Sequence, residues 1–101
     1  MSTKTRALDR IRQAIRELRY RLSSHANEEM SDDALEAKDI EHIILTGAIT
    51  RQFTRDPRGT RYEIMGQTPA GHRAVVVCRF LPSSVLLVIT AYAEEAGKEP
   101  Q

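Results

Sequence analysis

Cysteine is almost absent from this 101-residue chain, and long apolar runs are absent altogether. Cys78 is the only cysteine, which excludes an intramolecular disulfide and a zinc site built on several cysteines. The longest purely apolar runs, 74–78 and 85–89, have five residues each, whereas a membrane span needs about 20. At this length the chain can form one modest core. We therefore expect one cytoplasmic domain with no membrane partner and no cofactor.

Aromatic residues are also scarce, with two Phe, three Tyr and no Trp. Because aromatic rings are the usual platforms for base stacking, this composition argues against a protein that stacks many nucleobases at once. Charge of one sign is not in excess either, since the formal net charge is only +1. These absences alone favour a small globular domain without an obvious nucleic-acid signature.

The charges that are present are segregated along the chain. Residues 1–24 carry seven basic and two acidic side chains, residues 25–48 carry one and seven, and residues 49–93 carry six and two. Twelve of the fifteen basic residues are Arg, whose guanidinium group matches the geometry of phosphates and carboxylates. The net charge therefore excludes no polyanionic partner. The Arg residues either meet such a partner or are neutralised by the acidic segment.

The first residues have the pattern of an amphipathic helix over about 3–19. Its apolar stripe, at three- and four-residue steps, consists of Leu8, Ile11, Ile15, Leu18 and Leu22. Three interpretations of this helix stay open. It packs on its own domain, its Leu and Ile seam joins two copies as a homodimer, or its Arg residues contact a nucleic-acid backbone.

Two further helices are predicted before residue 47. Residues 20–23 form a short extended link, after which Ser24 caps a brief helix that begins at His25 and is interrupted at 31–33. A third helix covers about 36–46, and Gly47 ends it.

After Gly47 the pattern changes to that of strands. Short segments rich in Val, Ile, Tyr and Thr cover 49–54, 60–68, 72–81 and 84–92. The turns between them are too short for anything but antiparallel connections. The predicted fold class is α+β, with the N-terminal helices packed on a four-stranded antiparallel sheet. We expect a single domain over 1–93 and a flexible tail over 94–101.

A set of short motifs in fixed order resembles a known family. The motifs are Tyr20-Arg21-Leu22-Ser23-Ser24-His25-Ala26, Met30, Asp39-Ile40 through Gly47, Arg61-Tyr62, Gly66-Gln67-Thr68 and Val88-Ile89-Thr90-Ala91-Tyr92. They resemble small bacterial domains, formerly of unknown function, that are often encoded beside a YgiT-type zinc-finger antitoxin. The resemblance implies kinship with the RelE, BrnT and MqsR toxins, ribonucleases that have helices on an antiparallel sheet. It thus implies a toxin that acts on RNA and is neutralised by a cognate antitoxin.

Metal-independent RNA cleavage needs a base, an acid and cations around the transition state. His25 is the candidate base or acid because the unperturbed pKa of histidine lies near neutrality, and Tyr92 is its complement. Arg61 and Arg79 are the candidate contacts to the transition state, and Thr90 is the candidate orienting hydroxyl. Simpler structural roles stay open for His25, as a cap packed between helix and sheet, and for Tyr92, as a half-buried aromatic.

Alternation places Thr90 and Tyr92 on the strand face of Val88 and Leu86. Arg79 interrupts an apolar strand, so it either pairs with a carboxylate such as Glu63 or faces a site that receives an anion.

Arg51 and Arg58, near Arg55 and Arg61, are predicted to form a basic strip for the RNA backbone, or simply a solvated turn. No metal ligand is predicted among the histidines, because their spacing on any one element does not fit a site. The rival functions are a non-catalytic module of the same fold that binds an antitoxin, DNA or another protein, and a structural role in dimerisation through the first helix.

Overall fold

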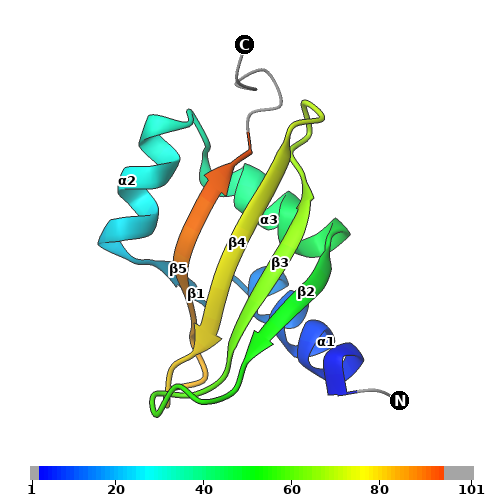
Figure 1. The fold of residues 1–101 in the computed structure, drawn as a ribbon, viewed down its shortest axis with the longest axis vertical. Coiled ribbons are helices and arrows are strands. Elements are labelled where there is room, and N and C mark those ends of the chain that lie inside the picture. The colour runs from blue at the N-terminus through cyan, green and yellow to red at the C-terminus, as the bar shows by residue number, and fades with distance from the viewer. Residues whose placement is uncertain (1–2, 95–101) are drawn as a thin grey trace.

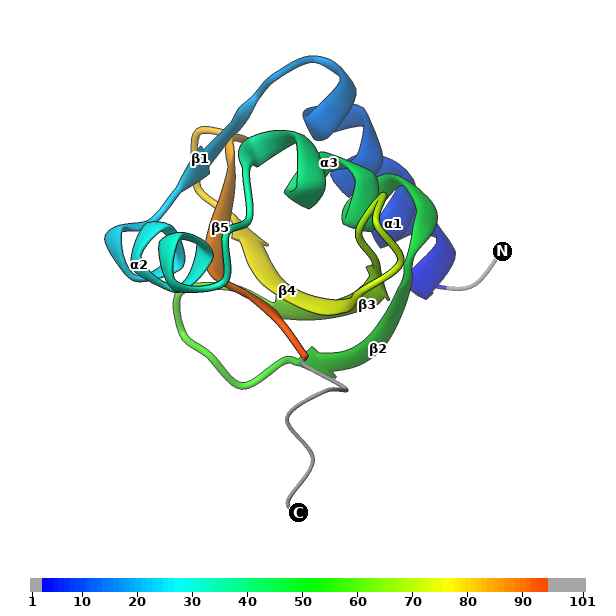
Figure 2. The same cartoon turned by 90° about the horizontal axis from the view of Figure 1, so that it is seen from above.

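A curved β-sheet wraps around helices in the computed structural model, which describes residues 3–94 (Figures 1 and 2). The elements are α1 (Thr3–Arg16), β1 (Tyr20–Leu22), α2 (Ser24–Asp32), α3 (Ala37–Thr46), β2 (Ala48–Phe53), β3 (Arg61–Gln67), β4 (Arg73–Phe80) and β5 (Leu86–Ala93). The strand order is β1-β5-β4-β3-β2. Apart from Glu94, the tail that was predicted to be flexible lies outside the described residues. No helix within residues 3–94 is long and apolar enough to cross a membrane.

The predicted α+β class is confirmed, but the predicted four-stranded antiparallel sheet is wrong, because the sheet has five strands and is mixed. Strands β2 to β5 pair antiparallel in chain order. The segment expected to be an extended link is β1, which pairs in parallel with β5 from Tyr20 beside Leu86 to Leu22 beside Val88. A three-residue strand is too short to show an alternating pattern in the sequence. The Tyr20 hydroxyl also donates a hydrogen bond to Glu41 of α3, at 2.5 Å.

The first helix is shorter than predicted and ends in a Schellman motif. Leu18 has a φ of 57°. The Arg19 N–H donates to the Ala14 carbonyl at 2.8 Å, and the Leu18 N–H donates to the Ile15 carbonyl at 3.1 Å. Leu18 is 71% exposed, so it does not belong to the apolar stripe, whereas Ile11 and Ile15 are buried in the core. The seam of α1 therefore packs on the chain's own domain.

The second helix begins one residue earlier than predicted, and its N-cap is Ser23 rather than Ser24. The Ser23 hydroxyl accepts from the backbone N–H three residues on, at 3.0 Å, and donates to the Ile89 carbonyl at 2.9 Å. The helix ends at Asp32, inside the segment 31–33 that was predicted to interrupt it, and Met30 is buried beneath it. Ser23 thereby fixes the start of α2 against β5.

The third helix forms where it was predicted and crosses the centre of the sheet. Its buried side chains are Ile40, Ile43 and Ile44. Gly47 follows it, and a Cβ on this glycine would lie 2.5 Å from the Met65 carbonyl oxygen. Only glycine allows the end of α3 to approach β3 so closely. Arg12 of α1 then donates to the carbonyls of Ile44 and Gly47, at 3.1 and 2.8 Å, which caps the helix end.

The sheet has a covered face and an uncovered one. The side chains that join the core with the helices include Ile64, Val76, Cys78, Leu86 and Val88. Helices α1 and α3 lie inside the curve of the sheet, and α2 flanks the edge of β5 (Figure 2). None of the described residues forms a helix over the opposite side, which faces the viewer in Figure 1. We call this side the outer face.

Candidate functional site

The outer face gathers side chains from β2, β3, β4 and β5 in rows across the sheet. One row consists of Phe53, Arg61, Arg79 and Leu87, and the next consists of Arg51, Glu63, Val77 and Thr90. The third consists of Met65, Val75 and Tyr92. Five predicted site residues therefore share this face, and three of them are arginines.

The prediction that Thr90 and Tyr92 share a strand face with Val88 is wrong. Val88 is fully buried in the core. The pairing of β4 with β5 shifts in register between Val88 and Thr90, so Ile89 is an extra residue on β5. Such a β-bulge reverses the alternation of side chains beyond it. Both hydroxyl-bearing residues consequently lie on the outer face, on the same side of the sheet as the arginines.

Arg61 and Arg79 are neighbours on adjacent strands, one step beyond the pair formed by Tyr62 and Cys78. The Nε atoms of both arginines are buried without a hydrogen-bond partner. Arg61 lies near one carboxylate, whereas Arg79 makes no ion pair within residues 3–94. An unsatisfied buried donor is costly, so these two side chains need an explanation other than stability.

The expected pair between Arg79 and Glu63 is not formed. Glu63 instead accepts a hydrogen bond from the Thr50 hydroxyl, at 2.9 Å. Thr50 is the extra residue of a bulge in β2, so its side chain reaches Glu63 on the neighbouring strand. Of the two interpretations of Arg79, the pair with a carboxylate is not found within residues 3–94, and the anion site stays a prediction.

The carboxylates of the acidic segment, residues 25–48, do not neutralise the outer face. Glu29 accepts from the Ala91 N–H at 3.0 Å, and Asp33 accepts from the Ala93 N–H at 2.9 Å. These two carboxylates provide hydrogen-bond acceptors for backbone N–H groups of β5 that lie beyond the end of β1. Among the described residues, no ion pair joins the segment to an Arg of the sheet.

His25 lies apart from the rows of the outer face, in the first turn of α2. Its side chain is 64% exposed, and its Nε2 lies 3.4 Å from Glu29 Oε1. The interpretation that it packs between helix and sheet is therefore wrong. Because Glu29 also binds the backbone of Ala91, the residue before Tyr92, His25 is linked to β5 through one carboxylate.

The hydroxyl of Tyr92 lies among negative charges. Burial raises the pKa of Tyr92, and the carboxylates of Glu63, Glu94 and Glu29 raise it further. The side chain consequently keeps its proton at neutral pH. Tyr92 can donate a proton or a hydrogen bond there, but it cannot serve as a base.

Arg58 lies in the turn between β2 and β3, where its charge is offset. Its Nε is 3.2 Å from Asp56 Oδ1, and Arg61 Nε is 3.3 Å from Asp56 Oδ2. Hydrogen bonds from the Arg58 backbone and guanidinium lower the pKa of Asp56, so this carboxylate stays ionised. Sequence reasoning gave Asp56 no role. It also missed Phe53, which its spacing of two residues from Arg51 would have placed on the outer face.

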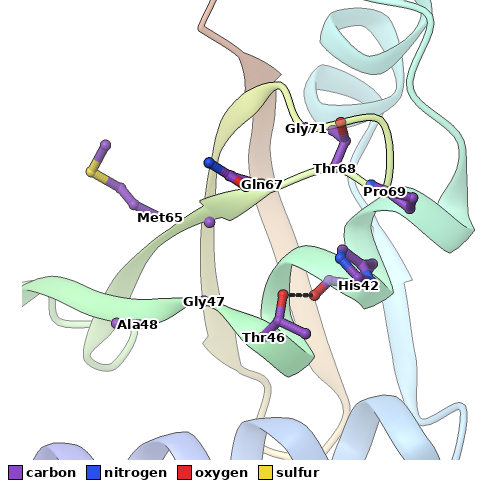
Figure 3. A pocket seen from close by; sticks show the side chains of 10 residues that line it. His42, Thr46, Gly47, Ala48, Met65, Gln67, Thr68, Pro69 and Gly71 are labelled. Atoms are coloured by element: carbon purple, nitrogen blue, oxygen red, sulfur yellow. Dashed lines mark hydrogen bonds between the residues drawn. The ribbon is translucent and has the colours of Figure 1, made fainter.

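A hollow of about 590 Å³ lies between α3, the start of β2 and the β3–β4 turn. His42, Thr46 and Gln67 surround it (Figure 3). The Thr46 hydroxyl donates to the His42 carbonyl at 2.7 Å.

In the part of the chain that the structure describes, no three His, Cys, Asp or Glu side chains come together to hold a metal ion. Burial raises the pKa of Cys78 to about 12, which makes its thiol unreactive.

Comparison with known proteins identifies the family of the chain. Residues 22–93 match the family described as Domain of unknown function (DUF4258). The match covers most of the chain and leaves α1 outside it, so the chain belongs to this family. No curated protein and no solved structure is detectably similar to it.

Proposed function

We propose that this DUF4258 domain binds RNA on its outer face and cleaves it without a metal ion, as the toxin of a toxin–antitoxin pair. The observation that carries the proposal is the pair of adjacent arginines, Arg61 and Arg79, whose buried Nε atoms make no hydrogen bond. Asp56 lies 3.3 Å from Arg61 Nε, whereas Arg79 has no ion pair within residues 3–94. Phosphate oxygens match the geometry of a guanidinium group. Arg51, on the same face, extends the positive surface along the phosphate backbone.

The proposed chemistry divides the acid and base roles between two side chains. His25 accepts the proton of the ribose 2′-hydroxyl as that oxygen attacks phosphorus, and the contact with Glu29 orients its ring. Tyr92 donates a proton to the 5′-oxygen that leaves. Its hydroxyl is protonated at neutral pH, and its raised pKa makes it a weak acid. Arg61 and Arg79 lie two rows from Tyr92 on the sheet, so they bind the RNA backbone beside the bond that is cleaved. The products are a 2′,3′-cyclic phosphate and a 5′-hydroxyl end.

The toxin assignment rests on the resemblance of residues 20–93 to toxin-like domains. It implies a cognate antitoxin, which we propose is a YgiT-type zinc-finger protein, and an action in the cytoplasm. The neighbouring reading frame provides a direct check. A small adjacent protein with two Cys-x-x-Cys pairs supports the assignment, and growth that is unaffected by verified expression of this chain contradicts it.

Cleavage of a single-stranded RNA in the presence of EDTA tests the enzymatic part. We expect His25→Ala and Tyr92→Phe each to lower the rate by about 10² to 10⁴. His72→Ala is the matched control, because His72 is an exposed histidine in the β3–β4 turn, and it should leave the rate unchanged. Cleavage that survives both substitutions at full rate contradicts the proposed roles.

One observation favours a second candidate, a binding module of the same fold without catalysis. His25 is exposed in the first turn of α2 and does not lie in the rows that hold the arginines. RNA binding that depends on Arg61 and Arg79, together with no EDTA-resistant cleavage at any pH from 5 to 9, would identify this module.

A further inference from the structure

The end of the outer face nearest the β2–β3 turn holds a pocket of about 560 Å³. It is bounded by Phe53, by Asp56 and by the guanidinium-bearing residues Arg55, Arg58 and Arg61. This volume falls in the range of pockets that take small organic groups. Phe53 is the only aromatic side chain that lines it. The pocket therefore has one flat apolar wall, and arginine side chains surround that wall.

Two guanidinium groups lie against the ring of Phe53. The Cζ atoms of Arg51 and Arg61 are each 4.9 Å from the ring centroid. Arg51 precedes Phe53 by two residues on β2, and Arg61 is its cross-strand partner on β3. Planar guanidinium groups and aromatic rings both stack on nucleobases. The ring of Phe53 and the guanidinium groups of Arg51 and Arg61 therefore place three planar groups together, from β2 and β3.

Asp56 limits the positive charge of this pocket. Its carboxylate lies within 3.3 Å of the Nε atoms of Arg58 and Arg61, and its side chain is only 7% exposed. Of the residues in 3–94, none makes an ion pair with Arg51 or Arg55. Arg55 is therefore available to a phosphate, whereas the Arg51 guanidinium lies on the ring of Phe53.

We infer that Phe53, with Arg51 and Arg61, is a stacking subsite for one unpaired nucleobase. The inference rests on the proposed function and sharpens it, because a base must leave a duplex before it can stack on a protein side chain. The RNA that this face takes is thus single-stranded at the subsite. One stacking position is also consistent with a chain that has only five aromatic residues.

Binding of three fluorescent ligands to the full chain tests the subsite. The ligands are a 12-nucleotide single-stranded RNA, the same strand annealed to its complement, and the same strand with abasic sites that keep every phosphate. Wild type should bind the intact single strand about tenfold more tightly than the other two, in line with the contribution of one stacked base. Phe53→Leu should abolish that difference by weakening only the intact single strand.

Two further variants serve as controls for the effect of Phe53→Leu. Phe53→Tyr keeps the ring and should keep the preference for the single strand, which also answers the possibility that Phe53→Leu does not fold. Phe80→Leu makes the same change at a ring that also contacts a guanidinium, that of Arg10, but that packs against the core, so it should leave all three affinities unchanged. Equal affinities for the three ligands in wild type, or an equal loss for all three in Phe53→Leu, overturns the subsite and leaves RNA binding intact. No binding of any ligand by wild type overturns the proposed function itself.

Discussion

Strands β2 to β5 contribute side chains to both faces of the sheet, but the two faces differ in the kind of residue that is buried. On the helix-covered face, Ile64, Val76 and Leu86 are fully buried, and burial of apolar surface accounts for their presence. On the outer face, Arg61 and Arg79 keep buried Nε atoms that no acceptor satisfies. Stability explains the first set of residues and not the second. This difference is the reason for the proposal that the outer face binds a ligand.

The largest effect should separate the two faces at adjacent residues of β4. Val76 is completely buried against the helices, whereas Val77 is partly exposed on the outer face. Val76→Ala should lower the free energy of unfolding by about 2 kcal/mol or more, through lost burial and a cavity. Val77→Ala should cost less than half as much. Urea unfolding of both variants measures this, and equal costs would show that the outer face is packed as tightly as the core.

The flank of β5 should give the next effect. Ser23→Ala removes the N-cap of α2 and the hydrogen bond to Ile89, so we expect a loss of about 1–2 kcal/mol in the free energy of unfolding. Ser24→Ala is the matched control, because Ser24 is exposed and does not cap the helix. It should change stability by no more than about 0.5 kcal/mol. A larger loss from Ser24 than from Ser23 contradicts the assigned cap.

A smaller and pH-dependent effect is expected at the contact between β1 and α3. Burial, with the Glu41 carboxylate second, raises the pKa of Tyr20 to about 12. The folded state therefore holds this proton more tightly than the unfolded state, where the pKa is near 10.0. Its contribution to stability is full below pH 10 and is lost as the pH rises towards 12.

Tyr20→Phe tests this contribution. It should cost about 1 kcal/mol at pH 7, the typical value of one hydrogen bond. The difference in unfolding free energy between wild type and variant should shrink as the pH rises from 10 to 12. A difference that stays constant over that range would show that the hydroxyl does not titrate as assigned.

The smallest effect is expected at the exposed end of the outer face. Arg73 Nε lies 3.6 Å from Glu94 Oε1, and both side chains are well exposed. An exposed ion pair contributes little, so Arg73→Ala should change the free energy of unfolding by less than about 0.5 kcal/mol. It should also leave RNA affinity nearly intact, because Arg73 is neutralised and lies outside the rows with Arg61 and Arg79. If Arg73→Ala lowered RNA affinity as much as substitution of Arg79 does, the binding site would have to extend over the whole outer face.

Regular elements could be predicted from the sequence because their signals are local. The third helix has an apolar period and a terminal glycine, and strands β2 to β5 lie within a few residues of the predicted segments. The irregular features were missed for physical reasons. The strand at 20–22 forms because β5 offers it an edge, and Ser23 caps α2 because it also binds Ile89. Both depend on contacts that are distant in sequence.

The candidate site illustrates the same limit. The sequence predicted a basic strip near Arg51 and Arg61 but did not place Arg51, Arg61 and Arg79 on one face. That placement depends on the strand pairing and on the bulge in β2 before Arg51. Thr90 and Tyr92 were assigned to the wrong face, since one extra residue at Ile89 reverses the alternation without any mark in the sequence. The contacts of Asp56 with Arg58 and Arg61 could not be predicted either, because side-chain contacts in a turn depend on its backbone conformation.

Arg79→Met provides the most direct test of the claim that the outer face exists for an anionic ligand. The substitution keeps the apolar stem and removes a buried donor that has no acceptor. Unfolding free energy and RNA affinity should be measured on the same preparation. We predict stability that is unchanged or higher, together with RNA affinity lowered by about tenfold. A loss of more than about 1 kcal/mol in stability with unchanged RNA affinity would make Arg79 a structural residue and contradict the account.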